Sequence, residues 1–218
     1  MRLTKFGHAC VRIEHDGVVV VIDPGSFTQR EAVDGADVVL VTHQHPDHLD
    51  VEHLRAAGSG GAAIHTIGAV ADEIRAQAPD VAERVTVVAP GDVLDVGVPV
   101  RVVGEKHAVI HADYPRIDNS GFLLTLGDQR VYQPGDALVG PGEPVDVLLA
   151  PVSAPWLKIG EAIDFVRDVA APRTLAIHDR VYSEVGLGMV AMHMDNLALG
   201  GPDGGRTFVR LADGADLG

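Results

Sequence analysis

The chain has 218 residues, of which 46% are hydrophobic, so it is long and apolar enough to bury a substantial core. Its formal net charge of −14 argues against a duplex nucleic-acid binder, which needs a basic surface, and against an anionic membrane. The single cysteine, Cys10, excludes a disulfide within the chain, and the N-terminal residues lack the apolar stretch of a signal peptide. We therefore expect a soluble cytoplasmic protein that does not contact membranes.

The first half of the chain opens with short β-rich segments, and Asp16-Gly17 is typical of a hairpin turn between two of them. The glycines of Gly58–Gly61 are expected to end a helix. The expected strands are Arg2–Phe6, Cys10–Glu14, Val18–Ile22, Asp37–Thr42, Ala62–Thr66, Val85–Val88, Val93–Val96 and Val98–Val103, and the expected helices are Val51–Ala57 and Gly68–Ala78.

The second half repeats this order, with a hairpin around Gly127-Asp128 followed by strand–helix units. A surface turn is expected over Gly200–Gly205, and the last few residues are expected to fray. The expected strands are Gly121–Leu126, Gln129–Tyr132, Val145–Ala150, Thr174–Ile177 and Thr207–Leu211, and the expected helices are Ile159–Val169 and Ser183–Leu197.

Two halves of this kind predict an α/β fold with two sheets packed face to face and helices outside. No linker or low-complexity segment divides the chain, so we expect one domain over residues 1–218.

The most informative motif is His43-Gln44-His45-Pro46-Asp47-His48, which directly follows the apolar strand predicted over Asp37–Thr42. Imidazoles and carboxylates are ligands that zinc, manganese and iron accept. A loop that leaves a rigid strand end can direct several side chains to one point. The motif therefore predicts a metal site.

Three later residues also have side chains that can bind a metal. His107, Asp136 and His178 each follow an expected strand within a few residues. Functional sites in layered α/β folds gather where strands end. We therefore expect these three side chains to converge on the histidine-rich loop.

These motifs, together with Phe6 to Glu14 and Val21 to Gly25, resemble the metallo-β-lactamase superfamily, in particular its single-domain branch of metal-dependent hydrolases that includes ascorbate-phosphate lactonase-like proteins. The resemblance covers nearly the whole chain and implies a four-layer αββα sandwich with two mixed sheets. It also implies two divalent metal ions, with zinc expected and manganese or iron as alternatives. One ion would be held by His43, His45 and His107, the second by Asp47, His48 and His178, and Asp136 would bridge them.

Some assignments stay open. His107 and His111 lie four residues apart, and either could be the third ligand of the first metal; His107 is preferred because it is nearer the preceding strand. His111 would then face the substrate or support the ligands. Asp47, His111 and a bridging water are the candidates for the general acid, so Asp47 and His111 are the predicted catalytic residues.

Several further residues have two interpretations each. Asp23 is either a carboxylate that orients a metal-bound histidine or a turn residue, and His8 is interpreted as structural. Trp156 and Lys158 either shape a substrate pocket or pack on a helix and face solvent. Asp179 either orients a neighbour or is solvated. The polar loop with Asp113, Tyr114 and Arg116 either covers the site or is a solvated loop.

The predicted function is a metal-dependent hydrolase in which a metal-bridging hydroxide cleaves a small ester, lactone, amide or phosphodiester. The alternatives are a metal-dependent nuclease or phosphodiesterase, and a non-enzymatic metal- or ligand-binding module on the same fold. The expected partner is a small-molecule substrate, for which an anion is one option. Nucleic acid is not expected, and a homo-oligomer is one alternative for the assembly.

Overall fold

A computed structural model describes residues 1–199 and 205–218. The turn predicted over Gly200–Gly205 falls, apart from Gly205, on residues outside this description. Among the described residues, no helix has the length and apolarity needed to cross a bilayer.

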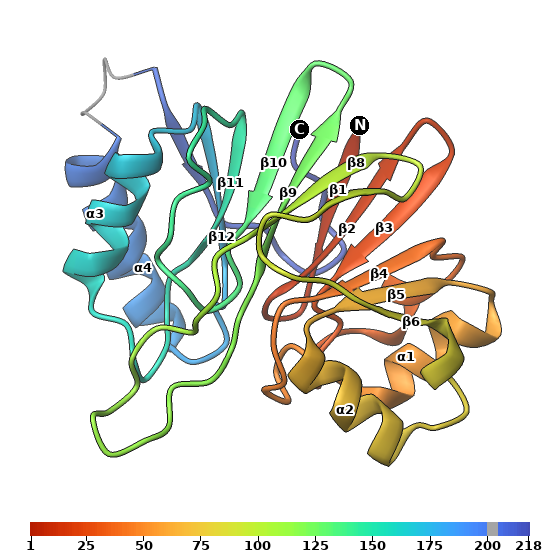
Figure 1. Cartoon of the computed structure of the whole chain (residues 1–218). Coiled ribbons are helices and arrows are strands. Elements are labelled where there is room, and N and C mark those ends of the chain that lie inside the picture. Colours follow the sequence, from red (N-terminus) through yellow and green to blue (C-terminus); the bar gives the residue numbers. More distant parts are fainter. Residues whose placement is uncertain (200–204) are drawn as a thin grey trace.

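The first sheet has six strands in the order β1-β2-β3-β4-β5-β6 (Figure 1). Its first three strands are antiparallel, and Asp16 and Gly17 form the predicted hairpin turn with φ of 49° and 82°. From β3 onward all neighbours are parallel. The strands are β1 Arg2–Phe6, β2 Cys10–His15, β3 Val18–Ile22, β4 Val38–Val41, β5 Ala63–Thr66 and β6 Val85–Val87.

The second sheet has seven strands in the order β13-β12-β11-β10-β9-β8-β7, antiparallel from β7 to β10 and parallel from β10 to β13. Both sheets are therefore mixed, as expected. The strands are β7 Val93–Asp95, β8 Pro99–Val103, β9 Gly121–Leu126, β10 Gln129–Gln133, β11 Val147–Pro151, β12 Arg173–Ile177 and β13 Thr207–Val209.

Helices cover the outer face of each sheet, which gives the expected four layers (Figure 1). The helix predicted over Ser183–Leu197 is divided: Ser183 caps an α-helix that ends at His193, and a π-helical turn follows. The helices are α1 Val51–Ser59, α2 Gly68–Gln77, α3 Ile159–Val169 and α4 Glu184–His193, with the short turns η1 Arg30–Val33, η2 Ala82–Arg84 and η3 Met194–Ala198.

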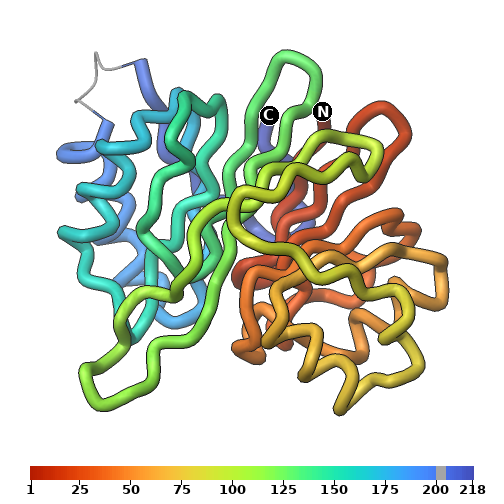
Figure 2. Tube along the Cα trace, in the orientation of Figure 1, coloured from red at the N-terminus to blue at the C-terminus, as the bar shows by residue number. Residues whose placement is uncertain are grey.

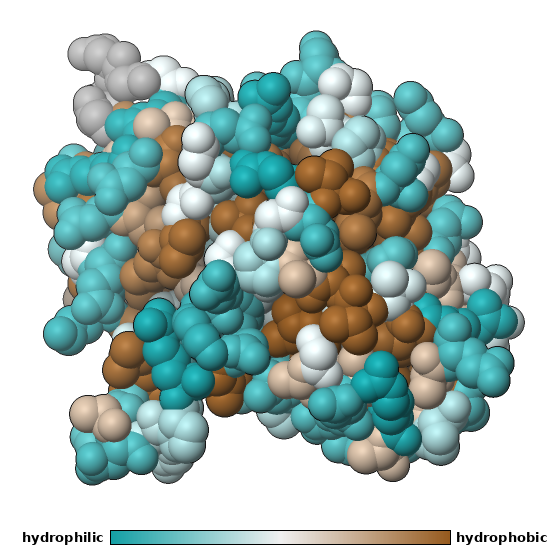
Figure 3. Space-filling model, viewed as in Figure 1, coloured by the Kyte–Doolittle hydropathy of each residue, from teal (hydrophilic) through white to brown (hydrophobic). Residues whose placement is uncertain are grey.

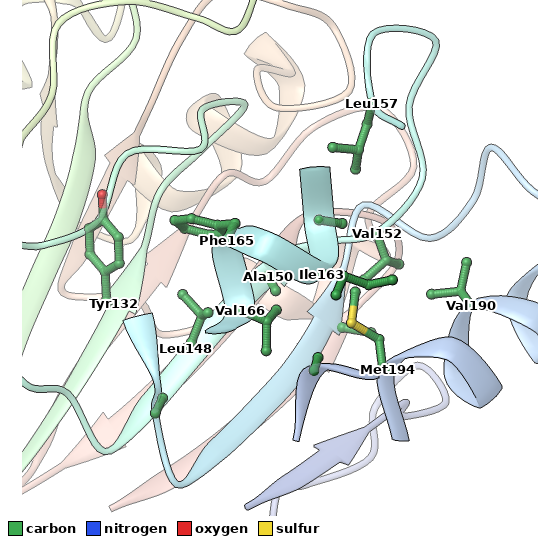
Figure 4. Close-up of a cluster of buried hydrophobic side chains, with 14 of the residues drawn as sticks. Tyr132, Leu148, Ala150, Val152, Leu157, Ile163, Phe165, Val166, Val190 and Met194 are labelled. Carbon is green, nitrogen blue, oxygen red and sulfur yellow. The ribbon is translucent and has the colours of Figure 1, made fainter. Parts of the chain in front are cut away.

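The interior strands are apolar on both faces because each face is covered. In β11, Val147 and Leu149 point into the core between the sheets, whereas Leu148 and Ala150 point to the helices. Figure 4 shows the helix-side cluster of the second sheet. Its labelled residues are Tyr132, Leu148, Ala150, Val152, Leu157, Ile163, Phe165, Val166, Val190 and Met194.

The C-terminal segment differs from the prediction of frayed residues. Leu217 donates its N–H to the carbonyl of Leu3 over 2.8 Å, and Asp216 accepts from the hydroxyl of Thr4 over 2.6 Å. The chain end therefore runs beside β1, and the N and C labels lie close together in Figure 2. These contacts give hydrogen-bond partners to backbone groups along the outer edge of β1, which would otherwise be an open sheet edge.

Candidate metal centre

The candidate site lies where strands of both sheets end. β4 ends at Val41 and leads into the histidine-rich loop, β10 leads to Asp136, and β12 leads to His178. The loop between β8 and β9 contributes His107. The tertiary structure thus brings all seven predicted metal ligands together: His43, His45, Asp47, His48, His107, Asp136 and His178.

The first group consists of His43, His45, His107 and Asp136. One ligand atom from each lies within 4.8 Å of the others. His43 Nε2 is 3.0 Å from His45 Nδ1, and His107 Nε2 is 3.3 Å from Asp136 Oδ2. The family resemblance assigned His43, His45 and His107 to the first metal and Asp136 to the bridge.

The second group shares Asp136. His48 Nε2 lies 3.1 Å from Asp136 Oδ1, whereas His178 Nε2 lies 3.2 Å from Oδ2. Asp47 forms a further group with His8 and His178, and its Oδ2 is 3.3 Å from Nε2 of His178, the residue that the two groups share. Both carboxylate oxygens of Asp136 therefore face imidazoles, and Asp136 belongs to both the first and the second group.

Hydrogen bonds to Nδ1 orient the rings of His43 and His48. His48 Nδ1 lies 2.9 Å from Asp23 Oδ2, which can only accept, so this nitrogen carries a proton. Thr42 donates its hydroxyl to the same Asp23 oxygen and accepts from His43 Nδ1 over 3.0 Å. Of its two interpretations, Asp23 therefore makes the orienting contact.

The rings of His107 and His178 are held by main-chain carbonyls. His107 Nδ1 lies 2.6 Å from the carbonyl oxygen of Ala108, and His178 Nδ1 contacts that of Ser153. Carbonyl oxygens only accept, so the proton of each neutral ring is on Nδ1. The Nε2 lone pairs of all these rings consequently point to the centre.

Buried ligand atoms at the centre lack hydrogen bonds. The Nε2 atoms of His48, His107 and His178 and Oδ1 of Asp136 are buried, and none makes a hydrogen bond to a described group. Leaving such acceptors unsatisfied costs on the order of 1–3 kcal/mol each. Cations would accept all these lone pairs, so the residues present fit divalent metal ions.

The charges of the centre perturb its pKa values. Burial lowers the pKa of His178, but Asp136 and Asp47 outweigh it and raise that pKa to about 9. Burial also opposes a charged His48, yet Asp136 and Asp23 hold its pKa well above the ordinary value. Burial dominates at His43, whose pKa is well below the ordinary value. Protons on His48 and His178 therefore balance the carboxylates, and a bound cation would displace them.

The family model for the β-lactamase superfamily domain matches residues 2–178. The chain belongs to this superfamily. The predicted superfamily resemblance and four-layer sandwich are therefore confirmed.

Relatives match most of the chain, and a solved structure shares its fold. Protein Rv0786c of Mycobacterium tuberculosis is 41% identical over 187 residues, covering 83% of this chain and 85% of that protein. A protein of Aeropyrum pernix named UPF0173 metal-dependent hydrolase is 29% identical over 195 residues, covering 78% and 80%. Igni18, a metallo hydrolase from Ignicoccus hospitalis, shares the fold with a TM-score of 0.75, 18% identity and coverage of 99% and 97%.

Strained or glycine-dependent backbone positions hold Asp136, His178 and Asp23 in place. Gly135, before Asp136, has φ of 64°, and a Cβ there would lie 2.3 Å from Asn119 Oδ1. That oxygen accepts the N–H of Asp136 over 3.0 Å. His178 and Asp23 are non-glycine residues with φ of 56° and 51°, a conformation retained where surrounding contacts over-determine it.

The sequence interpretation of His8 as structural did not predict that it contacts Asp47 and His178 in the centre. His8 is fully buried, its ring centroid is 3.8 Å from that of His178, and its Nε2 lies 3.5 Å from Asp47 Oδ2. Its Nδ1 accepts the N–H of Arg180 over 2.9 Å, so the proton of the neutral ring is on Nε2. His8 therefore directs an N–H at Asp47, the reverse of the other rings. Its position near the end of β1 was the only available signal.

Trp156 also reaches the centre. Its indole N–H donates to Asp136 Oδ2 over 3.0 Å, and its ring meets His107 and His178 edge-on at centroid distances of 5.6 and 6.3 Å. Lys158, which was considered with it, extends into solvent. Trp156 thus supports the carboxylate between the two groups, a contact that sequence reasoning did not anticipate.

The remaining predicted residues lie outside the ligand groups. His111 is exposed in the loop between β8 and β9, with Asp113 and Tyr114. Arg116 donates from Nε to the carbonyl of His107 over 2.6 Å. Asp179 is buried, and its Oδ1 lies 3.1 Å from Lys5 Nζ, so of its two interpretations it contacts a neighbour and is not solvated.

Proposed function

We propose that this chain is a hydrolase that depends on two divalent metal ions. The observation that carries the proposal is the convergence of seven histidine and aspartate side chains with buried, unpartnered ligand atoms. The metal-dependent hydrolase name of the Aeropyrum pernix relative supports it. Zinc suits this ligand set, and manganese or iron are alternatives because imidazole and carboxylate accept all three.

The residues divide into two ligand sets. His43, His45 and His107 would hold one ion, Asp47, His48 and His178 the other, and Asp136 would bridge. When bound, the ions would acidify a water molecule to make it a nucleophile at neutral pH and polarise the bond under attack. The Nδ1 hydrogen bonds described above keep the imidazoles oriented for these roles.

Two residues are suited to move protons. Asp47 is a partly exposed carboxylate of the centre, so it would take the proton that water releases and pass it to the leaving group. His111 is the second candidate because it lines the cavity next to His45 and His107. A His111→Gln variant separates them: a loss in kcat with unchanged metal content would favour His111.

Metal content and activity test the proposed function together. Mass spectrometry of the purified and reconstituted protein is expected to find about two ions per chain, with His107→Ala losing one and His111→Ala losing none. Hydrolysis of ester, lactone and phosphodiester panels should require the ions and return when they are added back. A protein that binds one ion per chain or fewer under these conditions would contradict the proposal.

A further inference from the structure

The loop between β8 and β9 encloses a cavity beside the metal centre. Lys106 and Asp118 pair at its neck, and His107 donates its N–H to the carbonyl of Ile117 over 3.1 Å. Ala108 donates its N–H to the carbonyl of Asp136 over 2.7 Å, which ties the loop to the centre. This loop is the yellow-green segment that projects at the lower left in Figure 2.

The cavity has a volume of about 260 Å³, and the ligands His45 and His107 form one wall. Pockets for drug-sized molecules begin at about 300 Å³, so this one has room for a part of a molecule. A substrate group inside the cavity would be bonded directly to the substrate atom at the metal centre.

The other walls are mainly apolar. Val109, Ile110 and Tyr114 line the cavity, although their exposed fractions are 58%, 43% and 69%. Figure 3 shows hydrophobic surface beside this loop. Clustered apolar side chains exposed next to a site mark ligand contact rather than core packing.

The lining also contains the polar side chains of Arg116 and His111. Arg116 supplies the guanidinium of the lining, and its Nε is already engaged by the carbonyl of His107. His111 also lines the cavity, and its Nδ1 accepts the backbone N–H of Asp113 over 3.2 Å. Neither contact removes the positive charge of Arg116, so the apolar side chains of Val109, Ile110 and Tyr114 are the part of the lining that favours an apolar group.

From the position and the apolar lining of this cavity we infer that it binds the apolar acyl group of an ester or lactone whose carbonyl carbon lies at the metal centre. This inference rests on the proposed function and specifies its substrate class. In the reaction, water adds to the carbonyl carbon and the carbon–oxygen bond to the alcohol breaks. The departing oxygen takes one proton of the water, and a carboxylate, an alcohol and one released proton result.

The test compares 4-nitrophenyl acetate, butyrate and hexanoate with bis(4-nitrophenyl) phosphate on the metal-loaded protein. A buried methylene contributes about fourfold to transition-state binding, so kcat/KM should rise about 15-fold from acetate to butyrate, which adds two methylenes. Ile110→Ser should reduce this ratio towards one. Val185→Ser is the matched control, because Val185 is exposed on α4 and does not line the cavity.

The outcomes separate the inference from the proposed function. Equal kcat/KM for all esters, or equal ratios in Ile110→Ser and Val185→Ser, would overturn the acyl pocket. Cleavage of the phosphodiester alone would overturn the ester substrate class and retain the hydrolase. If nothing is cleaved while two ions are bound, the hydrolase fails. Calorimetric titration with acetate and hexanoate then tests the pocket: tighter binding of hexanoate supports it, and equal affinity overturns it.

Discussion

The backbone N–H of Arg180 donates to Nδ1 of His8 over 2.9 Å, and this contact distinguishes His8 from the other histidines of the centre. It leaves the ring proton on Nε2, which faces Asp47 at 3.5 Å. A protonated nitrogen cannot donate a lone pair to a metal. The structure therefore makes His8 a positioning residue for Asp47, although its nitrogen lies within reach of a ligand group.

Replacing His8 should selectively weaken binding of the metal ion that Asp47, His48 and His178 are proposed to hold. His8→Leu removes the N–H that faces Asp47, and loss of such a partner typically lowers metal affinity about 10- to 100-fold. His8→Gln restores a donor and should recover most of the affinity. Calorimetric titration of the metal-free protein measures both sites, with His15→Leu as a control. Equal losses in the Leu and Gln variants would instead mean that His8 is itself a ligand.

The hydrogen bond from Trp156 to Asp136 predicts an optical signal. Trp156 is the sole tryptophan of the sequence, so intrinsic fluorescence reports directly on the centre. Titration with zinc should change this fluorescence and saturate at the metal stoichiometry found by mass spectrometry. Trp156→Phe keeps an aromatic ring but removes the N–H, and we expect about tenfold weaker metal binding because hydrogen bonds to charged groups contribute about 1.5–3 kcal/mol. Unchanged affinity would show that this hydrogen bond does not support Asp136.

The buried ion pair behind His178 predicts a large loss of stability. Lys5 is 1% exposed, and its Nζ lies 3.1 Å from Asp179 Oδ1. Lys5→Met leaves Asp179 buried without this partner and should lower the free energy of unfolding by about 3–5 kcal/mol. Lys5→Met combined with Asp179→Leu should cost less than Lys5→Met alone.

Denaturant unfolding of the metal-free protein measures these differences. Arg75→Met is the control, because Arg75 pairs with Asp72 at the surface and its loss should change stability little. A Lys5→Met variant as stable as the parent would show that the buried pair contributes nothing net.

The raised pKa of His178 predicts opposite pH effects on the metal-free protein and on metal binding. That pKa is about 9 in the folded protein against 6.5 for an ordinary histidine. The protonated ring therefore stabilises the fold fully below about pH 6.5, and this contribution, a few kcal/mol at most, is lost as the pH rises through 9. The Tm of EDTA-treated protein should fall between pH 6.5 and 9.5, and His178→Gln should flatten the curve.

Metal affinity should change in the other direction. An ion must displace the proton of His178, so binding releases protons at pH 7 and strengthens as the pH rises to about 9. Calorimetry in buffers of different ionisation enthalpy counts the released protons. A Tm that rises over the same pH range, with no proton release, would contradict this assignment of charge.

Local patterns predicted much of this protein because their physical causes are local. Asp16-Gly17 adopts the left-handed conformations that a tight hairpin requires, and the apolar runs became strands covered on both faces. Element ends were less predictable: the strand expected over Val145–Ala150 is Val147–Pro151, because ladder hydrogen bonds with neighbouring strands define the ends.

For the candidate site, the sequence by itself supplied the ligand types and placed them after strands, since the order of strands and polar residues is written along the chain. Only the tertiary structure decided which ligand atoms meet, because convergence depends on how two sheets pack. It alone placed Trp156 against Asp136, and Lys5 against Asp179. The proton position on His8 was likewise decided by an N–H 172 residues away, a contact that no local pattern encodes.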